Sequence, residues 1–278
     1  MYTNKLIDEW IAEDVPYFDL TTHLLGIGNK VGSIGFFSRD KITLASIDEA
    51  IQILKRFDLD VVKTARSGDK AEPGEVFLKA SGYTDNIHKA WKVTLNLFEY
   101  SCGISTRTAK LVSAAREVNP RIAVLTTRKV FPGTKAVSIG AAIAGGALPH
   151  RLGLGETILV FDKHLAKIEG GYEGLAKLLP GMKDKVCDKE ICVEVVTEEE
   201  AMLMVNVGVD ALQFDKVAPD ALAGIVSKIR DTGKDVKIIA AGGVNGENAG
   251  EYAKAGVDAI STTWIYFGKP ADMSVEIE

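Results

Sequence analysis

Charged side chains recur at the ends of short apolar runs in the second half of this sequence. Arg128 and Lys129 follow one run, Glu194 lies inside another, and Asp215 follows a third. A carboxylate within an apolar run costs free energy unless it has a partner, which makes Glu194 a candidate for chemistry. Two separated carboxylates can hold Mg²⁺ and stabilise a developing positive charge, and neighbouring cations can hold a polyanion. The set suits the binding of a phosphorylated sugar together with a metal ion.

Glycines and histidines add to this set. Gly242 and Gly243 stand between an apolar run and a helical stretch, where their backbone N–H groups could bind a phosphate. His150 and Arg151 precede a further run, and His164 follows it. Taken singly, each feature has an ordinary explanation, because cations near strand ends are usually solvated or paired and glycine pairs usually only form turns. Their shared placement on one rim favours a binding site.

The elements that must position these residues alternate regularly. Six short apolar runs are predicted to be strands, at 122–127, 157–161, 191–196, 210–214, 236–241 and 257–261. Helical stretches lie between them, and Thr197 with Glu200 is a capping box that opens one of these helices. Such alternation indicates a parallel sheet, and we expect a closed or nearly closed α/β barrel, with a doubly wound open sheet as the alternative. Active sites of such barrels lie at the carboxyl ends of the strands.

The first half has a different rhythm and predicts a smaller α+β domain. Two helices alternate with extended segments, and further helical stretches at about 86–101 and 104–118 lead into the barrel. We therefore expect an N-terminal α+β sandwich domain over 1–105 and a barrel domain over 106–264. The tail, 265–278, is a segment that could return to the first domain.

The composition argues against several classes of protein. The chain has 278 residues and a formal net charge of −5, which is unfavourable for a nucleic-acid partner. Its apolar runs fall short of the roughly 18 residues that span a bilayer. Cys102, Cys187 and Cys192 form no metal-ligand pattern, and an odd number of cysteines fits reduced thiols. We expect a cytoplasmic protein that binds neither membrane nor nucleic acid.

Several motifs match those of one family in the family's own order. They are "EDVPYFDLTT" (13–22), "TLNLFEYSCGIST" (94–106), "TRKVFPGTK" (127–135), "GGALPHRLGL" (145–154), "VEV" (193–195), "AAGGV" (240–244) and "GVDAIS" (256–261). On these motifs the chain resembles nicotinate-nucleotide pyrophosphorylase, also called quinolinate phosphoribosyltransferase. It is more similar still to the ModD subgroup, pyrophosphorylases named for their association with molybdenum-transport genes.

The resemblance implies a type II phosphoribosyltransferase fold, with an N-terminal sandwich, an incomplete TIM-like α/β barrel and an active site at a homodimer interface. The family joins quinolinate to phosphoribosyl pyrophosphate with Mg²⁺, releases pyrophosphate and CO₂, and serves NAD biosynthesis. The resemblance assigns the ring acid to Arg128, His150 and Arg151. It assigns the sugar phosphate and the metal to residues that are therefore expected to be catalytic: Lys129, Glu194 and Asp215, the two carboxylates being the metal ligands.

Four positions depart from the family pattern. Lys92 stands where the family has an arginine, Phe161 where it has a lysine, Ala241 where it has a serine, and Thr263 where it has a glycine. An arginine fork binds a carboxylate in bidentate fashion and a lysine does not. The acceptor side has thus lost positive charge, so we predict a small acidic acceptor that departs from quinolinate. The predicted substrate-binding residues are Lys92, Arg128, His150, Arg151, Phe161, His164, Ala241, Gly242, Gly243 and Thr263.

Two other functions remain open at this point. Lys129 beside Arg128 could have a lowered pKa and form a Schiff base, which would make the protein a lyase or isomerase on a phosphate-binding barrel. A non-catalytic protein that senses a phosphorylated metabolite, or serves molybdate homeostasis, is the second alternative. We also expect a homodimer in which Lys92 completes the pocket of the partner subunit, because the matching position does so in the family.

Overall fold

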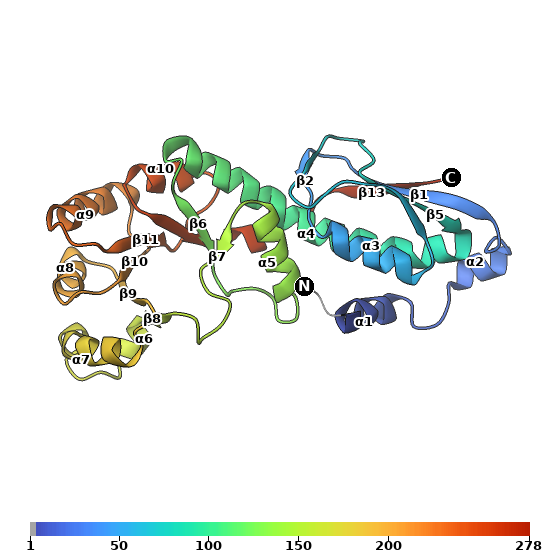
Figure 1. Ribbon diagram of the computed structural model, residues 1–278. Coiled ribbons are helices and arrows are strands. Elements are labelled where there is room, and N and C mark those ends of the chain that lie inside the picture. Colours follow the sequence, from blue (N-terminus) through green and yellow to red (C-terminus); the bar gives the residue numbers. More distant parts are fainter. Residues whose placement is uncertain (1–3) are drawn as a thin grey trace. The chain divides into compact units, whose positions relative to one another are not determined.

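The computed structural model describes residues 4–278, which divide into two compact units (Figure 1). The first unit contains the chain up to Ala109, with Phe131–Gly146 and Tyr266–Glu278. The second unit contains Lys110–Val130 and Ala147–Ile265.

Residues 131–146 belong to the first unit, whereas the sequence placed them in the barrel domain. Side-chain contacts explain this difference. Tyr100 Oη lies 2.9 Å from Ser138 Oγ, and a Cβ at Gly145 would lie 2.6 Å from the carbonyl oxygen of Ser105. Tight packing of this kind depends on residues far away in sequence, so the local pattern does not reveal it.

The first unit is built on a four-stranded antiparallel sheet in the order β13–β1–β5–β3. The C-terminal strand pairs with the first strand of the chain, so the tail returns to the N-terminal sheet (Figure 1). The elements of this unit are α1 (Asn4–Asp14), α2 (Leu20–Leu25), β1 (Val31–Ser38), β2 (Ile42–Thr43), α3 (Ile47–Arg56), β3 (Asp60–Thr64), β4 (Lys70–Ala71), β5 (Leu78–Tyr83), α5 (Lys135–Ala144) and β13 (Met273–Ile277). Its core includes the edge-to-face rings of Phe36, Phe77 and Phe98.

Helix α4 (Thr84–Val118) is continuous, whereas the sequence predicted two helical stretches. Ser101 lies near the predicted break, and its hydroxyl donates to the carbonyl of Leu97 at 2.7 Å, which satisfies it inside the helix. Gly103 has little room for a side chain, because a Cβ there would lie 3.1 Å from the backbone nitrogen of Ala271. This glycine therefore serves close packing and does not end the helix.

The second unit contains seven parallel strands in the order β7–β6–β12–β11–β10–β9–β8. The strands are β6 (Ala123–Thr126), β7 (Leu148–Pro149), β8 (Ile158–Val160), β9 (Ile191–Val195), β10 (Ala211–Asp215), β11 (Lys237–Ala241) and β12 (Ala259–Thr262). The helices are α6 (Asp162–Leu165), α7 (Gly171–Lys185), α8 (Glu198–Asn206), α9 (Pro219–Asp231), α10 (Ala249–Lys254) and the 3₁₀ turn η1 (Trp264–Tyr266), which ends in the first unit. All six predicted strands are confirmed, as is the capping box that opens α8.

The two edge strands of this sheet, β7 and β8, come together at one end. Arg151 follows β7 and Phe161 follows β8, and the guanidinium carbon of Arg151 lies 5.7 Å from the centroid of the Phe161 ring. The sheet is therefore curled into an incomplete barrel, which confirms the predicted fold class. Within residues 4–278, no helix is long and apolar enough to cross a membrane.

Candidate active site

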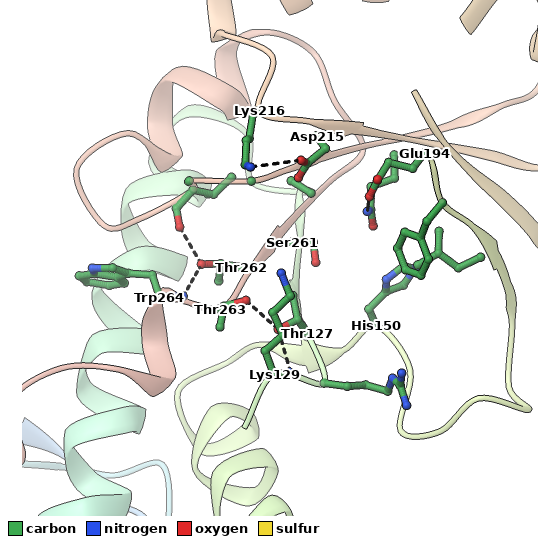
Figure 2. Close-up of a pocket in the computed structure, with 18 of the residues that line it drawn as sticks. Thr127, Lys129, His150, Glu194, Asp215, Lys216, Ser261, Thr262, Thr263 and Trp264 are labelled. Carbon is green, nitrogen blue, oxygen red and sulfur yellow. Dashed lines mark hydrogen bonds and ion pairs between the residues drawn. The ribbon is translucent and has the colours of Figure 1, made fainter. Parts of the chain in front are cut away.

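A cavity of about 570 Å³ opens at the carboxyl ends of the strands of the second unit (Figure 2). This volume is typical of small-molecule sites. Most of the predicted site residues line it: Arg128, Lys129, His150, Arg151, Phe161, Glu194, Asp215, Ala241, Gly242, Gly243 and Thr263. The topology explains why, since parallel strands bring their carboxyl ends to one rim.

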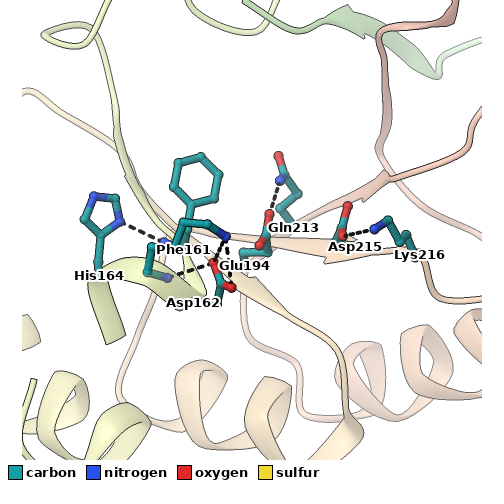
Figure 3. A network of polar contacts seen from close by, with 8 residues as sticks. Phe161, Asp162, His164, Glu194, Gln213, Asp215 and Lys216 are labelled. Carbon is teal, nitrogen blue, oxygen red and sulfur yellow. Dashed lines mark hydrogen bonds and ion pairs between the residues drawn. The ribbon is translucent and has the colours of Figure 1, made fainter. Parts of the chain in front are cut away.

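One wall of the cavity is formed by two carboxylates on neighbouring strands, Glu194 on β9 and Asp215 on β10. Glu194 on β9 and Gln213 on β10 are paired in register, and the amide of Gln213 donates to Glu194 Oε2 at 3.0 Å (Figure 3). Burial and, to a lesser degree, the charge of Asp215 raise the pKa of Glu194, while the hydrogen bond from Gln213 opposes the rise. This wall therefore carries negative charge that the hydrogen bond from Gln213 compensates only in part.

The turn after β10 packs tightly against the turn after β11. The backbone N–H of Lys216 donates to the carbonyl of Ala241 at 2.8 Å. A Cβ at Gly242 would lie 2.5 Å from Asp215 Oδ1 and 2.7 Å from the backbone nitrogen of Lys216. Gly242 and Gly243 also have φ of 79° and 87°, a region that glycine tolerates best. Only glycine fits at position 242, for both reasons.

The opposite wall of the cavity is cationic. Arg151 is only 9% exposed, and no carboxylate of residues 4–278 forms an ion pair with it. Burial and the nearby charge of Arg128 lower the pKa of Arg151. A buried guanidinium beside another cation is costly unless an anion compensates it. This wall therefore favours the binding of an acidic ligand.

His150 stands between strand β7 and Arg151 in the sequence and lines the same cavity. Its backbone N–H donates to the carbonyl of Thr126 at 3.0 Å, which fixes the residue at the end of β6. Burial and then the charge of Arg151 lower the pKa of His150. The imidazole is therefore neutral near pH 7, where it can donate one hydrogen bond and accept another.

Lys129 and Thr263 are held together by a threonine. The Thr127 hydroxyl lies 2.8 Å from that of Thr263, and the backbone N–H of Lys129 donates to Thr127 Oγ1 at 3.2 Å (Figure 2). The ends of the neighbouring strands β6 and β12 are thereby tied to each other. The side chain of Lys129 is exposed and lines the cavity, where it can meet a polyanion.

Lys92 and His164 do not line the cavity. Lys92 is exposed on α4, in the first unit. His164 supports Phe161, whose backbone N–H donates to His164 Nδ1 at 3.0 Å and whose ring stacks on the imidazole with centroids 5.6 Å apart (Figure 3). Direct roles of Lys92 and His164 in substrate binding stay predictions.

Several further residues line the cavity and are not among the predicted site residues. Gln213 is polar within an apolar run, the same signal that singled out Glu194, and could have been found in this way. Lys216, Asn245, Ser261 and Trp264 also line the cavity. Their local patterns are ordinary for strand ends and turns, so only the fold selects them.

The residues present fit a magnesium ion that arrives with a phosphorylated substrate. Among residues 4–278, no group of three or more His, Cys, Asp and Glu side chains could hold an ion by itself. A dication would relieve the repulsion between Asp215 and Glu194 that contributes to the raised pKa of Glu194. Mg²⁺ usually binds one or two carboxylates together with substrate phosphates and waters.

Two family models match the chain. The model "Quinolinate phosphoribosyl transferase, C-terminal domain" matches residues 104–276, and the corresponding N-terminal domain matches residues 19–102. The chain belongs to the quinolinate phosphoribosyl transferase family. It is thus a phosphoribosyltransferase, and neither the Schiff-base enzyme nor the non-catalytic binding protein is favoured.

Curated relatives agree with this assignment. The ModD protein of Pasteurella multocida is 31% identical over 277 residues, which cover 100% of this chain and 98% of the relative. The ModD protein of Rhodobacter capsulatus is 35% identical over 248 residues, 88% of this chain and 94% of the relative. A protein of Archaeoglobus fulgidus named probable nicotinate-nucleotide pyrophosphorylase (carboxylating) is 29% identical over 266 residues, 95% of this chain and 99% of the relative.

Solved structures support the fold. The nicotinate-nucleotide pyrophosphorylase of Francisella tularensis superposes with a TM-score of 0.89 at 24% identity and covers 100% of this chain and 98% of its own. The enzyme of the same name from Ehrlichia chaffeensis superposes with a TM-score of 0.90 at 18% identity, over 100% and 99% of the two chains. At these identities the likeness concerns the fold alone.

Proposed function

We propose that this protein transfers the phosphoribosyl group of phosphoribosyl pyrophosphate to a small acidic ring acceptor, with release of pyrophosphate. One observation carries the proposal: the cavity has on one wall a buried guanidinium without an ion pair among residues 4–278, and on the other a mutually repelling carboxylate pair. An acidic acceptor compensates the first wall. An electropositive sugar carbon, and a Mg²⁺ ion that the carboxylates would hold, would compensate the second.

In the proposed reaction, the ring nitrogen of the acceptor forms a bond to C1 of the ribose while the bond from C1 to the pyrophosphate oxygen breaks. Arg128, Arg151 and neutral His150 orient the acceptor. Glu194 and Asp215 stabilise the oxocarbenium-like carbon electrostatically and would hold Mg²⁺. The ion, when bound, neutralises charge on the departing pyrophosphate.

Lys129 is proposed to bind the donor's phosphates. Calorimetry of Lys129→Ala should show an affinity for phosphoribosyl pyrophosphate and Mg²⁺ that is reduced at least about tenfold, or about 1.4 kcal/mol. Lys163→Ala is a matched control, because Lys163 pairs with Asp162 at 3.0 Å and lies outside the cavity lining. Unchanged affinity in Lys129→Ala would refute the role of Lys129.

We infer that the acceptor departs from quinolinate. A phenyl ring at Phe161 cannot neutralise a carboxylate, and it contacts Arg151, the best candidate to do so. Quinolinate carries two carboxylates, and leaving one buried without a partner costs several kcal/mol, on the order of 3–5. Steady-state assays should therefore find poor conversion of quinolinate. A kcat of about 1 s⁻¹ or more, which is ordinary for an enzyme, would contradict the inference.

We also infer a homodimer in which Lys92 reaches the site of the partner subunit, as the family resemblance implies. Sedimentation at micromolar concentration should detect a dimer. Lys92→Ala and Lys129→Ala should each lose activity, and mixing and reassociating them should restore part of it, because a mixed dimer contains one intact site. Mixing that restores nothing, or a monomer in sedimentation, would contradict this arrangement.

A further inference from the structure

Lys216 has an unusual backbone conformation in the cavity. Its φ is 59°, in the left-handed region that costs free energy for residues with a side chain. Among residues 4–278, the other non-glycine residues with positive φ are Ser46 and Asp58, and neither lines the cavity. Asparagine, aspartate and glycine tolerate this region far better than lysine does. The lysine at this position therefore needs an explanation.

The left-handed conformation of Lys216 follows from the tight turn of the chain directly after β10. Lys216 N–H donates to the Ala241 carbonyl at 2.8 Å, at the end of the register in which Asp215 of β10 pairs with Ala241 of β11. Lys216 also packs on Gly242, where a Cβ would lie 2.6 Å from Lys216 Cγ. The turn thus places the lysine directly against the glycine pair. Asparagine or glycine at position 216 could make the same backbone hydrogen bond, so the fold does not require a lysine.

The ammonium group of Lys216 interacts only weakly with the rest of the protein. Its side chain is 79% exposed, and its Nζ lies 4.0 Å from Asp215 Oδ2 (Figure 3). An exposed ion pair at that distance stabilises a fold little or not at all. No hydrogen bond or other ion pair of this ammonium is present among residues 4–278. The charge is therefore available to a ligand in the cavity.

We propose that Lys216 binds a phosphate group of the phosphoribosyl donor, beside the backbone N–H groups of Gly242 and Gly243. The proposal rests on the proposed function and adds a residue to its donor site. A lysine ammonium is a compact charge with three donors, which suits a phosphate oxygen. Strained conformations persist at functional sites where the side chain is needed. The phosphate could belong to the diphosphate or to the sugar 5-phosphate, since both carry the same chemistry.

The test uses the full-length protein with two phosphate probes, inorganic pyrophosphate with Mg²⁺ and ribose 5-phosphate. Lys216→Gly and Lys216→Asn remove the charge and accept the left-handed backbone, whereas Lys216→Arg retains the charge. Asp58→Gly is the control, because it relieves a left-handed residue (φ 51°) in the first unit. We expect Lys216→Gly and Asp58→Gly to keep or raise the melting temperature.

Only the charge-removing Lys216 variants should bind one probe at least about tenfold more weakly. The probe that is affected identifies the phosphate. Equal affinity of Lys216→Gly and the unmodified protein for both probes would overturn the proposal, as would an unmodified protein that binds neither probe. The proposed function fails separately, if the unmodified protein binds a probe but releases no pyrophosphate from the donor with any ring acid.

Discussion

The two walls of the cavity are built by different parts of one sheet. The carboxylate wall comes from β9 and β10, which have a hydrogen-bonded neighbour on both sides. The cationic wall comes from the segments after β6 and β7, and Phe161 beside it follows β8; β7 and β8 are the edge strands, of two and three residues. Ladder pairing on both sides holds the carboxylates rigidly, while Arg151 and Phe161 depend on how far the sheet curls. The fold thus keeps both carboxylates on strands that are paired on both sides, whereas two residues that face the acceptor, Arg151 and Phe161, follow edge strands.

The walls also differ in the direction in which the pKa values of their side chains are shifted. Burial and neighbouring charge raise the pKa of Glu194 on one wall and lower the pKa values of His150 and Arg151 on the other. In each case the ionised form is disfavoured until an opposite charge arrives. The cavity is therefore complementary to a ligand pair that is electropositive at one end and acidic at the other.

The largest effect is expected on the carboxylate wall. Glu194→Gln should lower turnover by about 100- to 1,000-fold, because a transition-state electrostatic contact is lost. The same change should raise the melting temperature of the ligand-free protein at pH 7, because it removes a poorly compensated carboxylate. Stopped assays and thermal denaturation measure the two effects, with Glu199→Gln, exposed on α8, as the control. A Glu194→Gln variant that keeps the turnover of the unmodified protein and is no more stable would contradict the proposed contrast between the walls.

Arg151 should give a different signature on the cationic wall. Arg151→Met keeps the length of the side chain and removes the guanidinium, so the KM for the acceptor should rise by about 10- to 100-fold, the loss of a charged hydrogen bond of about 1.5–3 kcal/mol. The affinity for phosphoribosyl pyrophosphate should change little. Arg121→Met, at an exposed turn, is the control. Equal losses for donor and acceptor would mean that the walls do not divide the substrates.

Phe161 tests how the edge strands choose the acceptor. Phe161→Lys restores a cation and should raise the preference for quinolinate over ring acids with one carboxylate, by about tenfold in kcat/KM, or about 1.4 kcal/mol. Lys92 and Ala241 stand where the family has an arginine and a serine, and the missing guanidinium and hydroxyl should limit the gain. Phe161→Met separates the effect of charge from that of ring removal. A preference that stays unchanged in Phe161→Lys would show that this position does not select the acceptor.

The smallest effect concerns His150 and pH. Its folded-state pKa is lowered below the usual 6.5, so the unfolded chain binds a proton at pH values where the folded protein does not. The contribution of His150 to stability is therefore fully present above pH 6.5 and is lost as the pH falls through its folded pKa. His150→Asn should make the melting temperature fall less between pH 7.5 and pH 5. Parallel pH profiles for the two proteins would contradict the burial of the imidazole.

Particular residues show what could be predicted from the sequence and what depended on the fold. Glu194 and Asp215 were predictable because strand periodicity is local and a carboxylate at the end of an apolar run stands out. Gln213 gives a similar signal, but its hydrogen bond to Glu194 depends on the register of β9 with β10. Lys216 follows Asp215 at the end of an apolar run, so its charge could be placed from the sequence, but its left-handed φ could not, because that follows from packing against Gly242.

The sequence by itself determined the alternation of strands and helices, the rim on which the charges gather and, through its motifs, the family. The tertiary structure decided the continuity of α4, the placement of residues 131–146 in the first unit, and the contact of Arg151 with Phe161 across the open edge of the barrel. The reason is physical. Periodicity and side-chain chemistry are properties of neighbouring residues, whereas burial, desolvation and the meeting of two sheet edges exist only once distant segments have packed together.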